Sequence, residues 1–285
     1  MAKLLKGAPV ARALTEELTR RTESLVEQGV RPTLGIIRVG EREDDLSYER
    51  GATKRCATIG IDVRKFVLDA SCSQAELLSA INQINADDSI HGCLMFRPLP
   101  ATLDEAEACE ALDPRKDVDC ITERSLFGVF ANKRMGFPQC TAEACLRILD
   151  HYGYELEGAR VCVVGRSLVI GKPVSLMLQA RNATVTMCHT RTRELDKTCS
   201  QAQILVVAAG HPGVIGARAA SAGQVVVDVG INWDEAAGKL CGDVAFDEVE
   251  PIVGAITPVP GGVGAVTTAV LAQHVVEAAE RRRGA

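Results

Sequence analysis

Helical and strand-like patterns alternate along most of this 285-residue chain. Short apolar runs separated by amphipathic helices are typical of parallel sheets covered by helices on both faces. In the first half we expect strands at 33–39, 61–68 and 92–96, and helices at 9–27, 44–59, 73–86 and 102–112. Ser73 and Glu76 have the spacing of a capping box at the start of the third helix. The predicted fold class is therefore α/β.

The pattern restarts after residues 116–139, a stretch without clear periodicity that we interpret as a link between two domains. Beyond it we expect helices at 141–151, 171–180 and 266–282, and strands at 160–164, 184–188, 204–208 and 225–229. The last helix follows a proline- and glycine-rich loop and could cover either domain. At about 150 residues per domain, the length fits one large or two ordinary domains.

Composition excludes several classes of protein. Hydrophobic residues make up 47% and charged residues 24%, so the chain can bury a core and is not expected to be disordered. The 32 Lys and Arg against 37 Asp and Glu give a net charge of -5, spread along the chain, which argues against a nucleic-acid surface. We interpret the one basic run, Arg281–Arg283, as a solvated helix end. No apolar run is long enough for a membrane helix or a signal peptide.

The eleven cysteines do not form a recognisable site. A disulfide framework is expected to have an even number, and a Cys-x2-Cys pair typical of metal binding does not occur. We interpret them as small buried hydrophobic residues in a reducing compartment. The chain is therefore predicted to be cytoplasmic, with no metal and no membrane partner.

A glycine turn between a strand and a helix is the first candidate site. Gly165, Arg166 and Ser167 follow strand 160–164, and Gly171 begins the next helix. Glycine lets the backbone approach a pyrophosphate, and the helix N-terminus favours its negative charge. Because the spacing is not G-x-G-x-x-G, an ordinary turn is the alternative.

The end of the next strand indicates which dinucleotide would bind. NAD sites usually place an acidic residue there for the ribose 2′-hydroxyl, but this chain has Cys188-His189-Thr190-Arg191. Arg166 and Arg191 could instead bind a 2′-phosphate, so NADP is predicted over NAD. The alternative is that both arginines are ordinary surface residues. Gly210 and the run Asp228–Asn232 also follow strands, although each could be only a turn.

Several motifs together resemble the methylenetetrahydrofolate dehydrogenase/cyclohydrolase (FolD) family, over about residues 5–277. The most specific is Thr257–Gly264 (TPVPGGVG). The others, in the family's order, are Arg97–Pro100 (RPLP), Lys116–Asp119 (KDVD), Gly165–Ser167 (GRS) and Asp228–Asn232 (DVGIN). The resemblance implies an N-terminal α/β catalytic domain, a Rossmann-type domain and a C-terminal helix that returns to the first. We therefore expect a folate-binding domain at 1–138 with helix 266–285, and an NADP-binding domain at 139–265.

The resemblance also implies an activity and a set of site residues. The dehydrogenase oxidises 5,10-methylenetetrahydrofolate with NADP to the methenyl derivative, and the cyclohydrolase hydrolyses that cation to 10-formyltetrahydrofolate. Family members of this kind are homodimers joined through the Rossmann domains. Tyr48 would stack on the folate and Asp119 would bind its pterin, and these two are the expected catalytic residues. The other expected folate-binding residues are Pro98, Leu99, Pro260, Gly261 and Gly262. The expected cofactor-binding residues are Gly165, Arg166, Ser167, Gly171, Thr190, Arg191, Gly210, Ile231 and Thr267.

Two positions depart from the family pattern. The resemblance places a catalytic Lys four residues after the Tyr, on the same helix face, where this chain has Ala52. It places a Gln two residues before Pro-Leu-Pro, where this chain has Phe96. Neither Ala nor Phe can transfer a proton. Lys54 would point to another side of the helix, and Arg55 would lie about 10 Å further along it.

Three hypotheses remain open. The leading one is an NADP-dependent methylenetetrahydrofolate dehydrogenase with weak or absent cyclohydrolase activity, since hydride transfer needs mainly alignment whereas ring opening needs proton transfer. The second is a bifunctional enzyme in which Arg55, Arg97 or another group replaces the Lys. The third is a folate- or nucleotide-binding protein without catalysis, against which the retained Tyr48, Asp119 and glycine-rich loop count.

Overall fold

The computed structural model describes residues 1–235 and 237–283. The chain divides into two compact units, which we name by their sheets. The three-stranded unit comprises residues 13–140 and 268–285, and the six-stranded unit comprises residues 1–12 and 141–267. Both are α/β, as the alternating pattern predicted.

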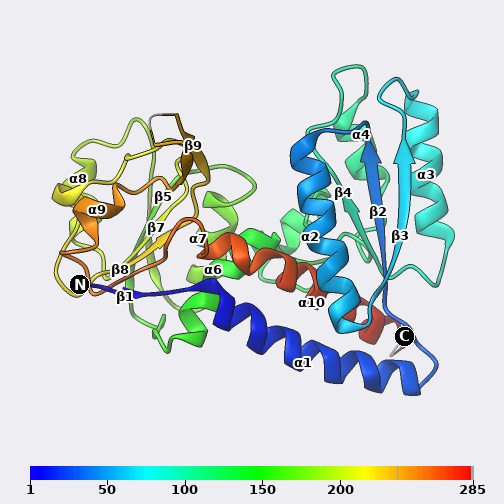
Figure 1. Cartoon of the computed structure of the whole chain (residues 1–285), viewed down its shortest axis with the longest axis horizontal. Coiled ribbons are helices and arrows are strands. Elements are labelled where there is room, and N and C mark those ends of the chain that lie inside the picture. The colour runs from blue at the N-terminus through cyan, green and yellow to red at the C-terminus, as the bar shows by residue number, and fades with distance from the viewer. Residues whose placement is uncertain (236, 284–285) are drawn as a thin grey trace. The chain divides into compact units, whose positions relative to one another are not determined.

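The three-stranded unit is built on a parallel sheet with the order β3-β2-β4. Its strands are β3 (Asp62–Leu68), β2 (Thr33–Val39) and β4 (Gly92–Met95). Every residue of β2 is buried, because this strand has a neighbour on each side. Helices α2 (Glu43–Ile59) and α3 (Gln74–Ala86) flank the strands (Figure 1).

The capping box at the start of α3 is present as predicted. Ser73 Oγ accepts a hydrogen bond from the Glu76 backbone N–H, and the Glu76 carboxylate accepts one from the Ser73 N–H. Ile81 and Ile84 of α3 then pack with Ile37 of β2 and Met95 of β4 in one hydrophobic core. Helix α4 (Glu105–Ala111) adds Ala108 and Cys109 to the same core.

Residues 116–139 are not the featureless link that their weak periodicity indicated. They contain helix α5 (Glu123–Ala131), which begins where Thr122 Oγ1 accepts the Ser125 backbone N–H. Before it, the buried Asp117 accepts the backbone N–H groups of Ile121 and Thr122, each at 2.9 Å. A helix of two turns that is stabilised by caps carries too few apolar positions for a periodic signal.

Two long helices each contain residues of both units. Helix α1 (Gly7–Glu27) and helix α10 (Thr267–Arg283) both begin in the six-stranded unit and continue in the other. In the three-stranded unit they are joined by Arg21, whose Nη2 lies 2.7 Å from Glu280 Oε2. The C-terminal helix thus returns to the unit formed by the first half of the chain, as the resemblance implied.

The six-stranded unit holds a sheet with the order β1-β11-β8-β7-β5-β6, in which all neighbours are parallel. The strands are β1 (Lys3–Leu4), β11 (Ala255–Ile256), β8 (Val225–Asp228), β7 (Ile204–Val207), β5 (Arg160–Val164) and β6 (Thr184–Cys188). The expected domain of residues 1–138 included the N-terminus. The first twelve residues instead belong here, because β1 pairs with β11 and supplies partners for the backbone groups of that strand.

Helices and a hairpin complete the six-stranded unit. The helices are α6 (Cys140–His151), α7 (Gly171–Ala180), α8 (Leu195–Ser200) and α9 (Phe246–Val249), and the hairpin pairs β9 (Asn232–Asp234) with β10 (Lys239–Cys241). Strands β1 and β11, helices α8 and α9 and the hairpin were not predicted from the sequence, because elements this short show no measurable period.

All eleven cysteines are free, and ten are buried. Three thiols cluster in the core of the six-stranded unit, where Cys162 Sγ lies 3.6 Å from Cys188 Sγ and 3.8 Å from Cys199 Sγ. Burial raises the pKa of the Cys56 thiol to about 12. Within the described ranges, no group of His, Cys, Asp and Glu has an arrangement that could hold a metal ion.

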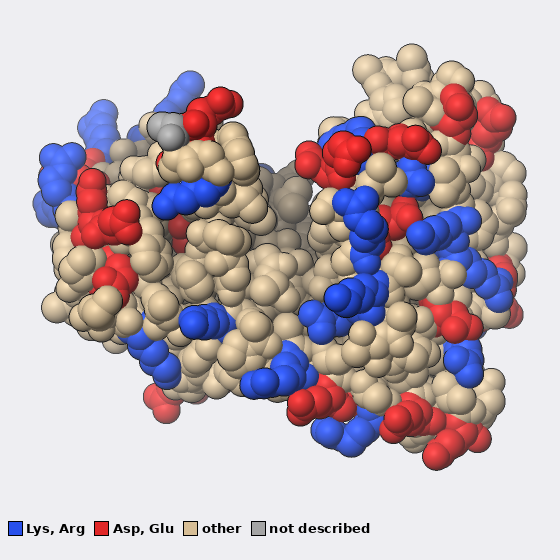
Figure 2. Space-filling view, in the orientation of Figure 1, with Lys and Arg blue, Asp and Glu red and all other residues tan. Residues whose placement is uncertain are grey.

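The described helices include none that is both long enough and apolar enough to cross a bilayer. On the face shown in Figure 2, Lys and Arg side chains are interspersed with Asp and Glu, so neither sign covers an extended area of that face.

Candidate functional site

The carboxyl ends of the strands define the candidate site of the six-stranded unit. Strand β5 lies between β6 and β7, so the chain moves to one side of β5 and then to the other. In open α/β sheets, ligands bind outside the carboxyl ends of the strands at such a reversal. The loops after β5, β6, β7 and β8 carry the glycine, arginine and asparagine motifs predicted from the sequence.

Gly165 closes β5 with a φ of 133°, a conformation that other residues rarely adopt. A Cβ atom at this position would lie 2.2 Å from the Ala208 carbonyl oxygen at the end of β7. The two loops at the strand reversal therefore touch through backbone alone, and a side chain at residue 165 would separate them.

The loop after Gly165 leads directly into α7. Ser167 Oγ accepts the Ile170 N–H at 3.1 Å and lies 3.5 Å from the Gly171 N. A Cβ on Gly171 would lie 2.3 Å from the Gly165 carbonyl oxygen, so this helix begins against the preceding turn. The N–H groups of Ile170, Gly171 and Lys172 are bonded to Ser167, so the start of α7 favours an anion such as a pyrophosphate through the helix dipole.

Arg166 and Arg191 are both exposed at this edge of the sheet. Neither guanidinium has a hydrogen bond or an ion pair within residues 1–235 and 237–283. The turn that presents Thr190 and Arg191 is shaped by His189, whose Nδ1 accepts the Arg191 backbone N–H at 3.2 Å. Two arginines without carboxylate partners are available for an anionic ligand.

A buried carboxylate network holds the next two loops, and its member Asp243 was not predicted from the sequence. Asp243 Oδ2 accepts the N–H groups of Ala209 at 2.6 Å and Gly210 at 2.8 Å, and its Oδ1 accepts Asn232 Nδ2 at 2.8 Å. Asp228 accepts the N–H groups of Asp243 and Val244, each at 3.0 Å. Burial raises the pKa of Asp228 to about 6, and the hydrogen bonds from these N–H groups oppose that shift. The only sequence signal was an acid beside a glycine, Gly242-Asp243, within an apolar stretch.

The proline- and glycine-rich loop is anchored to the same network. Thr257 Oγ1 accepts the Asp228 N–H at 2.8 Å. A Cβ on the buried Gly262 would lie 2.5 Å from the Pro258 carbonyl oxygen, whereas Pro260 and Gly261 are exposed. Further along, Thr267 Oγ1 donates to the Gly264 carbonyl at 3.2 Å. A Cβ on Gly264 would lie 3.5 Å from Ile231 Cδ1, so residues 231, 264 and 267 are close neighbours.

In the three-stranded unit, Tyr48 lies on α2 and faces Phe96 at the carboxyl end of β4. The ring centroids are 6.0 Å apart, with an interplanar angle of 81°. Ala52, one helical turn after Tyr48, is 1% exposed. Phe96 is 9% exposed. The two positions that depart from the family pattern therefore present only apolar groups.

The basic side chains that could have replaced the Lys are engaged or turned away. Arg55 Nη1 donates to Thr15 Oγ1 on α1 at 2.8 Å, and Lys54 is exposed. Arg97 Nη1 lies 3.6 Å from Glu105 Oε1. The same Glu105 accepts the Leu99 N–H at 2.8 Å, while the Pro98 carbonyl accepts Arg42 Nη1 at 2.9 Å. These contacts fix the Arg97–Pro100 loop.

Asp119 is placed by its neighbours in the Lys116–Asp119 motif. Lys116 Nζ donates to the carbonyl oxygens of Ile84, Asn85 and Asp87 at the end of α3, so this lysine is structural. Desolvation raises the pKa of Asp119, and a hydrogen bond from Cys140 opposes the shift. A carboxyl group of this kind can take part in hydrogen bonds as donor or acceptor.

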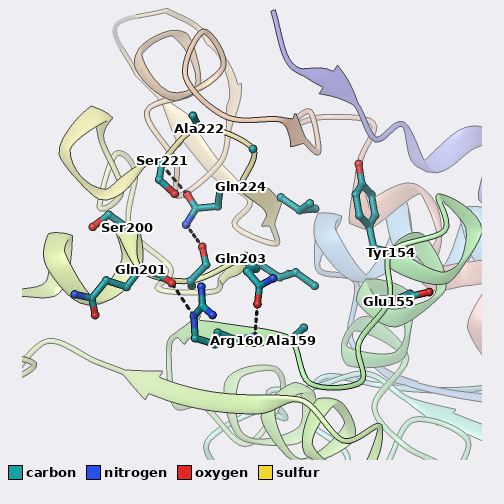
Figure 3. Close-up of a pocket in the computed structure, with 14 residues that line it drawn as sticks. Tyr154, Glu155, Ala159, Arg160, Ser200, Gln201, Gln203, Ser221, Ala222 and Gln224 are labelled. Atoms are coloured by element: carbon teal, nitrogen blue, oxygen red, sulfur yellow. Dashed lines mark hydrogen bonds between the residues drawn. The ribbon is translucent and has the colours of Figure 1, made fainter.

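A polar pocket of about 400 Å³ lies at the opposite edge of the six-stranded sheet (Figure 3). It is lined by Arg160 at the start of β5, Gln203 before β7 and Gln224 before β8. Gln203 Oε1 accepts the Arg160 backbone N–H at 2.9 Å, and Gln224 Nε2 donates to the Ala202 carbonyl at 2.9 Å (Figure 3). The pocket is at the amino ends of the strands and is distinct from the candidate nucleotide site.

The fold and these loops define an α/β protein with a dinucleotide-binding unit of the Rossmann type. Residues 5–119 match the tetrahydrofolate dehydrogenase/cyclohydrolase catalytic domain, and residues 139–283 match the NAD(P)-binding domain of the same family. The chain belongs to the tetrahydrofolate dehydrogenase/cyclohydrolase family, as the resemblance indicated.

Individual relatives match this chain along almost its whole length. The chain is 50% identical over 285 residues to the bifunctional protein FolD of Carboxydothermus hydrogenoformans, covering 100% of this chain and 99% of the relative. The crystal structure of the bifunctional FolD enzyme from Campylobacter jejuni is 35% identical with a TM-score of 0.95, covering 99% of this chain and 100% of that chain. The Trypanosoma brucei FolD structure, described as a complex with NADP cofactor and inhibitor, is 32% identical with a TM-score of 0.92, covering 100% of this chain and 99% of that chain.

Proposed function

We propose that this chain is an NADP-dependent methylenetetrahydrofolate dehydrogenase, which oxidises 5,10-methylenetetrahydrofolate to 5,10-methenyltetrahydrofolate. The observation that carries the proposal is the carboxyl edge of the six-stranded sheet, where the Gly165 turn and two free arginines lie at the strand reversal. Membership of the tetrahydrofolate dehydrogenase/cyclohydrolase family supplies the substrate class.

The residues of this edge fit NADP. The turn at Gly165 leads directly into the start of α7, whose dipole favours a pyrophosphate, and Arg166 and Arg191 suit a 2′-phosphate. Thr190, Gly210, Ile231 and Thr267 complete the proposed cofactor set. NADP supplies, when bound, a nicotinamide ring that accepts a hydride. The FolD structure from Trypanosoma brucei, described with NADP, supports this choice.

We assign folate binding in the three-stranded unit to Tyr48, Asp119, Pro98 and Leu99. Tyr48 offers an aromatic ring on α2, and Asp119 a protonatable carboxyl group that can pair with a pterin. Pro98 and Leu99 stand in the loop that Arg42 and Glu105 fix. In the other unit, the exposed Pro260 and Gly261 and the buried Gly262 leave little side chain in the way of a ligand.

The second candidate function is a bifunctional enzyme that also produces 10-formyltetrahydrofolate. The relatives named bifunctional, including the one at 50% identity, favour this candidate over loss of the cyclohydrolase. The side chains of this chain favour a weak cyclohydrolase, because Ala52 and Phe96 offer no proton donor or acceptor. General acid–base groups commonly contribute about 10²–10⁴-fold to a rate. We therefore propose a ring-opening step slower than the dehydrogenase step.

One assay separates the candidates. The protein is supplied with methylenetetrahydrofolate and either NADP or NAD, and the reduced cofactor and the methenyl cation are followed separately. The expected result is reduced NADP together with methenyl cation that accumulates, because the cation forms faster than the protein hydrolyses it. Enzyme-dependent conversion of the cation to the formyl product as fast as it forms would establish the bifunctional enzyme. Binding of both ligands without any reduced cofactor would favour the non-catalytic binding protein.

We also propose a cytoplasmic homodimer. Ten buried free thiols suit a reducing compartment. On the β9–β10 hairpin, Trp233 lies opposite Leu240, and they are 59% and 40% exposed. An exposed cross-strand apolar pair is a natural contact for a second copy. Light scattering of wild type and Trp233→Glu tests this, with a dimer expected only for the wild type.

A further inference from the structure

A basic cavity of about 560 Å³ lies in the three-stranded unit, outside the proposed folate and cofactor residues. Its lining includes six cationic side chains: Arg115, Lys116, Arg124, Arg134, Arg281 and Arg282. Asp88 and Asp113 are the only carboxylates among its described lining residues. A chain with a net charge of -5 thus concentrates positive charge at one cavity.

The cavity is remote from the Tyr48–Phe96 pair. His91 lines it and immediately precedes β4, whereas Phe96 immediately follows that strand. At about 3.3 Å per residue, the strand separates the two positions by roughly 16 Å. The cavity therefore lies at the amino end of the sheet, and the proposed folate residues lie at its carboxyl end.

Four of the six cations already have partners. Arg115 pairs with Asp113 at 2.6 Å, Arg281 lies 3.6 Å from Glu277, and Arg282 pairs with Asp88. Arg281 also donates to the Gly136 carbonyl at 2.9 Å and stacks over Phe137, so Arg281 and Arg282 are bound to the protein and are not simply solvated. Lys116 Nζ donates hydrogen bonds to three carbonyl oxygens.

Arg124 on α5 and Arg134 have no such partners. Within the described part of the chain, neither guanidinium makes a hydrogen bond or an ion pair. Each is a planar group with five N–H donors, arranged to bind two oxygens of a phosphate at once. Both line the same cavity, so they can act on one ligand.

His91 adds a neutral donor. Its Nδ1 accepts the Thr33 N–H at 3.2 Å, so the neutral ring carries its proton on Nε2. Burial and the nearby Lys116 lower the pKa of His91, which keeps the ring neutral at pH 7. The side chain is 7% exposed, and the described residues provide no acceptor for Nε2–H.

We propose that this cavity is a second ligand site, which binds a small phosphate-bearing polyanion through Arg124, Arg134 and His91. The volume is within the range of small-ligand pockets. Carboxylates also pair with arginine, so an oligocarboxylate is the competing ligand chemistry. Two guanidinium groups and a neutral N–H donor favour a ligand that has several acceptor oxygens on one atom. A phosphate group has this arrangement, because its oxygens share one phosphorus atom.

The test is isothermal titration of the full-length protein with inorganic pyrophosphate, and separately with tri-L-glutamate at the same ionic strength. We expect pyrophosphate to bind and tri-L-glutamate to bind at least tenfold more weakly. In Arg124→Gln/Arg134→Gln the Kd for pyrophosphate should rise at least ~10-fold, a factor that the loss of one charge-assisted hydrogen bond can produce. Thermal melts and dehydrogenase activity show whether this variant remains folded.

Two matched variants locate the site. Arg12→Gln/Arg20→Gln removes the same charge from exposed positions on α1, and Arg166→Gln/Arg191→Gln removes it from the proposed cofactor edge. Because pyrophosphate can also occupy the cofactor edge, that edge is a separate site in the titration, and both controls should keep the binding that Arg124→Gln/Arg134→Gln weakens. No binding to wild type, equal binding to the Arg124→Gln/Arg134→Gln variant, or loss in either control would overturn the proposal. Tighter binding of tri-L-glutamate than of pyrophosphate would overturn the phosphate assignment.

Discussion

The ring of Phe96 meets the ring of Tyr48 edge to face, with centroids 6.0 Å apart. Edge-to-face pairs of this kind are favourable and hold both rings in place. Phe96 thus fills, beside the proposed folate-stacking residue, a position where the family pattern implies a polar amide. With Ala52 one turn after Tyr48 on α2, the side chains at positions 52 and 96 include no group that can transfer a proton.

Restoring the two polar side chains should strengthen ring opening. We expect Ala52→Lys/Phe96→Gln to raise the cyclohydrolase rate by roughly 10²-fold, because general acid–base help is regained. Ala52→Lys alone should change it by less than ~10-fold, since Phe96 remains. The measurement is the decay of added methenyltetrahydrofolate, corrected for spontaneous hydrolysis. Lys54→Ala, at an exposed position of the same helix, is the control; full recovery in Ala52→Lys alone would refute the cooperative role of residue 96.

Removing Arg191 should separate the two nicotinamide cofactors. The Arg191→Ala variant should raise the KM for NADP by about tenfold or more and leave the KM for NAD unchanged, because only NADP carries a 2′-phosphate. Arg160→Ala changes an arginine at the other end of the same sheet and should affect neither constant. An equal loss with both cofactors in Arg191→Ala would show that this side chain does not recognise the 2′-phosphate.

The close approach of Gly165 to Ala208 should make residue 165 intolerant of any side chain. Gly165→Ala places a Cβ 2.2 Å from a backbone oxygen, whereas Gly158→Ala meets nothing within 4 Å. Both glycines have positive φ, 133° at Gly165 and 70° at Gly158, so Gly158→Ala accounts for the cost of about 1–2 kcal/mol that alanine has in the left-handed region. We expect Gly165→Ala to lose cofactor affinity by tenfold or more and to melt below Gly158→Ala. Equal behaviour of the two variants would disprove the backbone contact.

The buried Asp228 should make stability depend on pH in a defined direction. Its pKa is raised from 3.8 to about 6, so the folded state binds the proton more tightly than the unfolded state. This contribution is fully present below about pH 4 and is lost as the pH rises through 6. The free energy of unfolding of wild type minus that of Asp228→Asn, measured by urea unfolding, should therefore decrease from pH 4 to pH 6. An increase of this quantity over the same range would show that the hydrogen bonds lower the pKa of Asp228 by more than burial raises it.

Periodicity and turn chemistry predicted the regular part of the fold closely. Strand 160–164, helix 171–180 and strand 184–188 have the expected bounds, because glycine turns separate clear apolar runs there. Helix α5 and the pairing of β1 with β11 were not predicted. The first depends on caps at Thr122 and Asp117, and the second on a partner more than 250 residues away in the chain.

The site could be predicted only as a set of motifs. Spacing and residue type indicated Gly165, Arg166 and Arg191, because a strand–turn–helix places them at a known edge of a sheet. The role of Asp243, which receives two backbone N–H groups and a side-chain amide from other loops, depends on tertiary contacts that leave no local pattern. The same is true of Lys116, whose partners are the last carbonyls of α3.

The most direct measurement is transfer of label. The protein is incubated with NADP and 5,10-methylenetetrahydrofolate in which both hydrogens of the methylene carbon are deuterium, and the cofactor is analysed by mass spectrometry. Hydride transfer predicts one deuterium in each molecule of reduced NADP, formed together with methenyltetrahydrofolate. Reduced cofactor without deuterium, or no reduced cofactor from a protein that binds both ligands, would contradict the proposed dehydrogenase.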